Sequence, residues 1–327
     1  MKSILIILLI GVMPMMACEG DKGDPGPQGT QGEQGLQGEQ GEQGEPGTPG
    51  TDGKDANTAS FYFQNGYKGY NGTTDATLYN TIDIFSSPPT PGGEFIYAVT
   101  QENGADPTQV DSATAVLRFD GLAEVIEEEL GAGVCSGQLY INDATLFING
   151  LYLTLGASEA LLQVGIYGDD SPLFNETEVT WIAANNSEEW GRAGGEETWA
   201  VNDPYFELKG LVNMGYPVNL QTSNDIRSMR PLPVFIPREI IEKWLCEEGM
   251  NKGLRLAVFA GEAQVIIYSS EMSQASLRPV LYINVERSAA SDRKARPSSK
   301  EAWEIWHAKS YEEKMKPFYS LYPDEKQ

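Results

Sequence analysis

The sequence VLYINV at Val280–Val285 decides the fold class of the longest region of this chain. It places Leu281, Ile283 and Val285 on one face of an extended segment and Tyr282 and Asn284 on the other. An alternation with a period of two residues is typical of a β-strand with one buried face. The sequence therefore predicts a strand here.

Similar short runs of β-branched and aromatic residues continue back to residue 57, separated by clusters of Gly, Pro, Asn and Asp. They lie at Ser60–Gln64, Thr77–Ile84, Glu94–Thr100, Ala113–Phe119, Gln138–Ile141, Ala144–Ile148, Leu151–Leu155, Gln163–Tyr167, Glu178–Ile182, Val234–Ile236, Leu254–Phe259 and Gln264–Tyr268. Only Pro237–Cys246 has helical spacing. Many strands with almost no helix predict an all-β domain over residues 57–286, a jelly-roll-like β-sandwich.

A triplet repeat precedes this domain. Glycine occupies every third position from Gly20 to Gly53, twelve times without a break. Three polyproline-II strands wind together only when glycine fills the crowded axis at this period. Residues 18–56 therefore predict a collagen-like stalk and a homotrimer; a disordered polar linker is the alternative.

The first 17 residues predict an export signal, because a basic residue is followed by an apolar run too short to span a bilayer. Met15–Cys18 resembles a bacterial lipobox, in which the cysteine is lipidated. We expect Cys18 to anchor an exported lipoprotein in the outer membrane or at the cell surface, with no other membrane contact. A plain secretion signal is the alternative.

Residues 287–327 form a tail with a linker and a helix expected over Ser299–Lys316, opened by the capping-box pair Ser298 and Glu301. The tail carries nine basic and seven acidic residues, whereas residues 57–286 carry 11 basic and 31 acidic residues. Docking of the tail onto the acidic head or onto a neighbouring subunit is the hypothesis, and a helix that frays in isolation is the alternative.

The charge excludes some functions. Lys and Arg total 23 against 47 Asp and Glu, a net charge of −24, which disfavours nucleic acid as a partner. His307 is the single histidine, so sites that need two histidines are excluded. The chain has no nucleophile elbow and no phosphate loop. We expect a protein without enzymatic activity and without an organic cofactor.

Two smaller sites follow from residue type. Cys135 and Cys246 would form a disulfide in an exported chain, and two buried thiols are the alternative. Oxygen-bearing side chains crowd one loop and are candidate ligands of a structural calcium ion. They are Asp169, Asp170, Asn175, Glu176 and Glu178. An ordinary acidic loop is the alternative, and the acidic run Glu127–Glu129 is interpreted as a solvated face.

Aromatic residues among Gly, Asn, Asp and Glu are candidates for stacking on sugar rings. They are Tyr67, Tyr70, Trp190, Trp199 and Tyr205. For Tyr67 and Tyr70 the alternative is that each folds back over the sandwich as a plug and uses its hydroxyl as a polar handle.

Several landmarks occur in a characteristic order along the domain. They are Phe63–Asp75, Val116–Asp120, Glu178–Trp181, Trp244, Asn251–Leu256, Tyr268–Glu271 and Leu277–Ile283. This succession resembles the DNRLRE-type module, a disaggregatase-related β-sandwich counted among carbohydrate-binding modules, and the whole chain resembles bacterial collagen-like surface lipoproteins. The resemblance implies binding to extracellular polysaccharide, with acidic sugars such as alginate among the ligands of relatives.

The charge of the domain narrows the class of polysaccharide that we expect it to bind. Residues 57–286 carry a net charge of −20, which repels a polyanion. A neutral or cationic glycan, or another surface component, is therefore the expected partner of a non-catalytic adhesion protein. A structural subunit of an extracellular matrix or filament, with protein contacts only, is the alternative.

Overall fold

The computed structural model describes residues 58–85, 89–102, 110–154, 160–195, 218–220, 227–247, 249–287 and 297–326. The predicted export signal, Cys18 and the triplet repeat lie outside these residues, and so do Trp199 and Tyr205. All of the described residues belong to one compact unit, residues 53–327.

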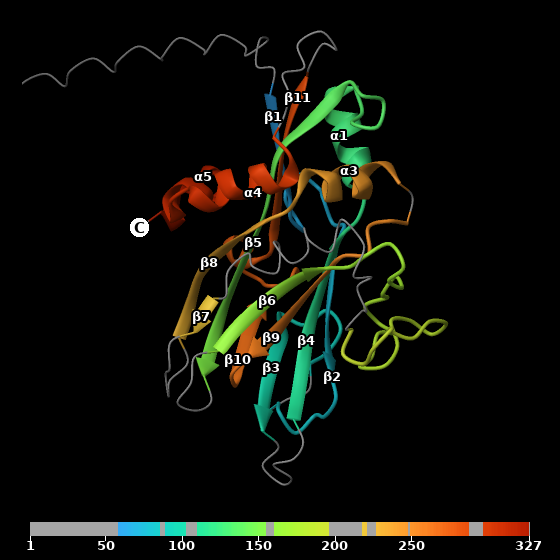
Figure 1. The fold of residues 1–327 in the computed structure, drawn as a ribbon, viewed down its shortest axis with the longest axis vertical. Coiled ribbons are helices and arrows are strands. Elements are labelled where there is room, and N and C mark those ends of the chain that lie inside the picture. The colour runs from blue at the N-terminus through green and yellow to red at the C-terminus, as the bar shows by residue number, and fades with distance from the viewer. Residues whose placement is uncertain are drawn as a thin grey trace, which may run out of the picture. The chain divides into compact units, whose positions relative to one another are not determined.

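Eleven strands of the described residues form one antiparallel sheet that curls on itself (Figure 1). The strands are β1 (Thr58–Phe63), β2 (Thr73–Tyr79), β3 (Phe95–Glu102), β4 (Val110–Phe119), β5 (Leu139–Thr154), β6 (Ala160–Ile166), β7 (Val218–Leu220), β8 (Arg227–Phe235), β9 (Leu254–Ala260), β10 (Ala263–Tyr268) and β11 (Val280–Arg287). Their order is β1-β11-β5-β10-β3-β4-β9-β6-β7, with β2 paired to β4 and β8 paired to β5. The prediction of a mainly β domain is confirmed.

The long strand β5 holds the sheet together. Its first part pairs with β11, its last part pairs with β10, and Thr145–Tyr152 pairs with β8. Three separate strands were expected here, which is wrong, because Asn149 and Gly150 do not form a turn. The buried Asn149 amide donates to the Ser276 carbonyl at 3.1 Å. A Cβ on Gly150 would lie 2.4 Å from the Ile266 carbonyl oxygen, so glycine permits the close approach of β10.

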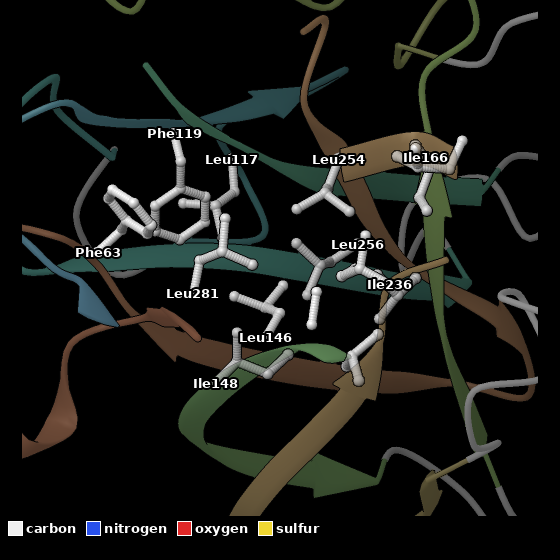
Figure 2. Packing of buried hydrophobic residues seen from close by; sticks show 14 of the residues in the cluster. Phe63, Leu117, Phe119, Leu146, Ile148, Ile166, Ile236, Leu254, Leu256 and Leu281 are labelled. Atoms are coloured by element: carbon white, nitrogen blue, oxygen red, sulfur yellow. The ribbon is translucent and has the colours of Figure 1, made fainter. Parts of the chain in front are cut away.

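The main core lies inside the curl of the sheet. Phe63 from β1, Phe119 from β4 and Leu146 from β5 point toward one another, and Leu254 and Leu256 from β9 extend the same cluster (Figure 2). Each of these side chains is 1% exposed or less. The alternation read from the sequence therefore has its physical cause here, because every second residue of these strands enters one shared apolar interior.

Two helices close one end of this core (Figure 1). Helix α1 (Leu122–Leu130) buries Leu122 and Ile126, and α3 (Arg238–Cys246) buries Ile240, Ile241, Trp244 and Leu245. A disulfide joins Cys135, which follows α1, to Cys246, the last residue of α3. The sequence analysis predicted α3 but no helix at α1.

The C-terminal tail packs on the outer face of the sheet. Helix α5 (Tyr311–Leu321) places Met315 and Phe318 against Phe147 of β5 and Val280 of β11. In helix α4 (Ser299–Ala308), Trp306 lies 5.6 Å from Phe235, centroid to centroid. The tail therefore docks onto the head of the same chain, as one form of the docking hypothesis predicts.

The expected single tail helix is wrong in one respect. The first helix ends before Lys309, which is extended, and Ser310 begins a second helix through its own capping box with Glu313. Both boxes are complete, so each helix begins with its first amide groups satisfied. Short 3₁₀ turns follow β10, at Ala275–Leu277, and α5, at Pro323–Glu325.

Candidate ligand-binding pocket

The loop after β1 presents Tyr67. Two tight turns fold this loop, with the Tyr67 amide donating to the Gln64 carbonyl at 3.0 Å and the Tyr70 amide donating to the Tyr67 carbonyl at 3.0 Å. Gly66 and Gly69 have φ angles of 86°, and Lys68 between them has 49°. The sequence GYKG therefore supplies glycines at two positions where a left-handed backbone is needed.

Buried hydrogen bonds hold this loop in place. The Gln64 amide donates to the carbonyls of Ala275 and Arg278 at 3.0 and 3.1 Å. The Arg278 guanidinium donates to the Asn65 carbonyl at 2.7 Å. Gln64 is 1% exposed, so these bonds are shielded from water. Tyr67 is thus carried on a loop whose base is fixed to the turn between β10 and β11.

Helix α1 forms the opposite side of a pocket. Gly121 before the helix and Gly131 after it both adopt the left-handed conformation, which limits the helix to nine residues. Leu122 and Ile126 face the core, and Glu128 and Glu129 are therefore turned outward. The Glu129 carboxylate lies 3.7 Å from the Lys68 ammonium, and both side chains are more than half exposed.

The pocket between them has a volume of about 310 Å³. Its lining combines tyrosine rings, one ammonium group and two carboxylates. The residues are Ser60, Phe61, Tyr62, Tyr67, Lys68, Gly69, Tyr70, Val125, Glu128 and Glu129. The rings of Tyr62 and Tyr67 meet edge to face with centroids 6.0 Å apart. The pocket therefore offers both apolar faces and charged hydrogen-bonding groups to a ligand.

Tyr62 contributes a ring that stays uncharged. Burial, together with the neighbouring Tyr282 and Tyr67, raises the pKa of Tyr62 to about 12. At neutral pH this side chain is a neutral ring whose hydroxyl is hydrogen-bonded to Ser320 of α5, so Tyr62 offers the pocket its ring. Sequence analysis did not select Tyr62, because it lies within a strand, and it interpreted Glu127–Glu129 as a solvated face, in agreement with their exposure, but not as part of a site. The spacing of Leu122, Val125 and Ile126 is the signal that would have revealed the helix that carries the two carboxylates.

The other aromatic candidates have different positions. Tyr70 is 7% exposed, and its hydroxyl donates to the Asp120 carbonyl at 2.8 Å, so it is the plug that the alternative described. Trp190 is 5% exposed, stacks on Tyr167 with centroids 5.3 Å apart, and donates to the Thr180 carbonyl. Both rings are therefore largely buried, which corrects both as exposed stacking platforms; Tyr70 still borders the pocket, and Trp190 is not among its lining residues. Trp199 and Tyr205 remain outside the described residues.

Trp190 is buried because residues 168–195 fold into a series of turns over β2 and β4. The expected strand Glu178–Ile182 is wrong for the same reason. The Val179 amide donates to the Asn175 carbonyl at 2.8 Å, and the Ala183 amide donates to the Thr180 hydroxyl at 3.0 Å. These local bonds compete with a sheet ladder.

The candidate calcium ligands do not converge. Asp169 pairs with Lys243, Glu176 accepts from the Gly92 amide, and Glu178 accepts from the Asn186 amide. Asn175 accepts from the Thr177 amide at 3.0 Å, and Asp170 is exposed. Within the described part of the chain, no three acidic, histidine or cysteine side chains form a group that could hold a metal ion. The calcium prediction is therefore not supported, because Asp169, Asn175, Glu176 and Glu178 each bind a different partner and Asp170 is exposed.

Comparison with known proteins adds no identification. No protein-family model matches the chain, and no curated protein matches it. Among the described residues, no helix is both long enough and apolar enough to cross a membrane.

Proposed function

We propose that this chain is a cell-surface lipoprotein whose β head binds an extracellular glycan without catalysis, in the pocket between Tyr67 and helix α1. The observation that carries the proposal is the chemistry of that pocket, whose lining combines tyrosine rings with two carboxylates. Sugars expose apolar C–H faces, which stack on aromatic rings, and hydroxyls, which donate to carboxylates. The resemblance to DNRLRE-type modules supports the same class of ligand.

The ligand is a neutral or cationic glycan. Glu128 and Glu129 add two negative charges at the pocket, and Lys68 adds one positive charge that lies near Glu129. A polyanion would meet these carboxylates and the field of the acidic head. A glycan that carries ammonium groups would gain charge-assisted hydrogen bonds instead.

Binding rather than hydrolysis suits the exposure of these groups. Glu128 and Glu129 are consecutive residues of helix α1, and both are open to water. A glycosidase instead needs an acid in a shielded environment and a second carboxylate across the scissile bond. The lipidated Cys18, the collagen-like stalk and the trimer belong to the same proposal and are supported by the sequence.

A pull-down of the purified protein on insoluble chitosan, cellulose and calcium-gelled alginate tests this proposal. We expect retention on chitosan or cellulose, with little on alginate, and about a tenfold or larger loss of affinity for Tyr67→Ala. Tyr268→Ala is the matched control, because Tyr268 of β10 is partly buried, as Tyr67 is, and lies outside the pocket lining. Glu128→Gln should weaken chitosan binding more than cellulose binding.

Equal binding by wild type and Tyr67→Ala would refute the pocket. If no glycan binds and the protein assembles into regular filaments by itself, the structural-subunit alternative replaces the proposal.

A further inference from the structure

Three carboxyl groups from three separate segments interact electrostatically, with the buried Asp75 of β2 at the centre. Asp75 belongs to β2, Glu271 to the turn after β10, and Glu176 to the segment between β6 and β7. Asp75 is 3% exposed, and its Oδ2 accepts from the Ser270 amide at 2.7 Å. The Ser270 hydroxyl donates to Glu271 Oε1 at 2.7 Å. The other oxygen of Glu271, Oε2, is buried without a hydrogen-bond partner.

The cations of the neighbouring elements are engaged elsewhere. Arg118 of β4 donates to the Asp120 carboxylate and to the Phe174 carbonyl. Arg278 donates to the carbonyls of Met272 and Asn65. Glu94, at the approach to β3, accepts from the hydroxyl and the amide of Ser273, and these two bonds lower the pKa of Glu94 and keep it ionised. The groups that act on Asp75 are therefore other carboxylates.

This arrangement makes a buried negative charge costly. Burial is the largest cause that raises the pKa of Asp75 from 3.8 to about 7, and the Glu271 charge is the second. The Ser270 amide favours the ionised form but is outweighed. Burial and Glu271 also raise the pKa of Glu176. At mildly acidic pH a proton on Asp75 relieves the repulsion among the three groups.

The turn that carries Glu271 also supports the pocket. Residues 269–278 include the Ala275 and Arg278 carbonyls that hold Gln64, and the Arg278 side chain that holds Asn65. The Ser269 hydroxyl of the same turn donates to the Gly93 carbonyl at 2.6 Å, and the neighbouring Gly92 amide donates to Glu176 at 3.0 Å. A displacement of this turn would therefore reach the base of the Tyr67 loop.

We propose that Asp75, Glu271 and Glu176 form a proton-linked latch, in which protonation of Asp75 holds the turn 269–278 against β2 and its deprotonation loosens that turn. This latch is independent of what the pocket binds. Its expected consequence for the pocket is a looser Tyr67 loop at alkaline pH, because both anchors of that loop come from the latched turn.

The sign of the pH dependence follows from the raised pKa. The proton contributes fully to stability below the unfolded value of 3.8, and the contribution is lost as the pH rises to about 7. With these two values, the folding equilibrium constant gains about a hundredfold from Asp75 at pH 5 and almost nothing at pH 8.

Urea unfolding of the full chain at pH 5 and at pH 8 tests the latch. The wild type should lose about a hundredfold more in its folding equilibrium constant between these pH values than Asp75→Asn, whose amide carries no charge at either pH. Asp170→Asn is the matched control, because Asp170 is exposed, and it should follow the wild type. Glu271→Gln should shift the midpoint of the dependence to lower pH. An identical pH dependence in wild type and Asp75→Asn would overturn the proposal.

Hydrogen exchange of the wild-type protein gives a test that needs no variant. The protection factor of the Ser270 amide should fall from pH 6 to pH 8 by more than the roughly tenfold fall that the loss of global stability imposes on amides of the β5–β11 ladder. Unchanged protection at Ser270 across this range would also overturn the proposal.

Discussion

Replacing Phe318 with alanine tests whether the C-terminal tail is an integral part of the head. Phe318 is 1% exposed, and its ring lies 5.5 Å from Phe147 of β5 and 5.4 Å from Tyr322, centroid to centroid. Removing a buried phenylalanine ring costs about 3 to 5 kcal/mol, because the transfer free energy is lost and a cavity remains. We therefore expect Phe318→Ala to lower the free energy of unfolding by about that amount.

The loss of stability caused by Phe318→Ala cannot exceed the free energy with which the tail docks on the head. If the docking of α4 and α5 contributes less than the cost of the cavity, the tail of the variant detaches and the loss stops at the docking free energy. Deleting residues 288–327 measures that limit directly. The two values together show whether the tail is docked strongly or weakly.

The assay is urea unfolding followed by both tryptophan fluorescence and far-UV circular dichroism. Trp306, one of six tryptophans, is 2% exposed beside Phe235, so undocking of α4 alone changes fluorescence while the circular dichroism of the sheet is kept. Ile305→Ala is the matched control, because Ile305 is 58% exposed on α4 and should change stability by no more than about 0.5 kcal/mol. A loss below about 1 kcal/mol for both Phe318→Ala and the deletion would refute the packing argument.

Two further perturbations test the frame around the pocket. Replacing Cys135 and Cys246 with serine should lower the free energy of unfolding by about 4 to 5 kcal/mol in the chain-entropy model, since the bridge closes a loop with a sequence separation of 111 residues. Urea unfolding with and without reductant measures this loss. Equal unfolding midpoints in the two conditions would contradict it. Gly72→Ala should destabilise by about 1 to 3 kcal/mol and weaken glycan binding, because a Cβ there would lie 2.3 Å from the Asp120 carbonyl oxygen and 2.8 Å from the Tyr70 hydroxyl. Thermal unfolding together with the chitosan pull-down measures both effects, and wild-type behaviour in both would show that the loop adapts.

Sequence alone predicted most strands, because their burial alternates within one shared core. The sequence-based prediction was wrong where polar side chains make hydrogen bonds that stabilise the fold. Asn149 suggests a turn, yet its buried amide bonds to Ser276 within a continuous strand. The segment at Glu178–Ile182 suggests a strand, yet Asn175 and Thr180 satisfy its amides locally. A pattern of residue types does not show which partner a polar side chain will meet.

The candidate site was only partly predictable for a related reason. Tyr67 was found because it lies in a glycine-rich loop, but the same reasoning selected Tyr70 and Trp190, which are buried. Tyr62 and Glu128 come from a strand and a helix that meet only in the folded domain. Their proximity depends on long-range pairing, which neither composition nor spacing shows.

The pairing of β1 with β11 has a consequence for how the chain reaches its native state. Thr58 lies opposite Glu286 and Phe63 opposite Leu281, so the first strand of the sheet finds its partner only in the last. At translation rates of about 5 to 20 residues per second, β11 is synthesised on the order of 10 to 40 s after β1. Contacts so distant in sequence also slow folding itself. The sheet is therefore completed only after nearly all of its strands have been synthesised. A chain whose sheet is still incomplete during this interval is compatible with the proposed export.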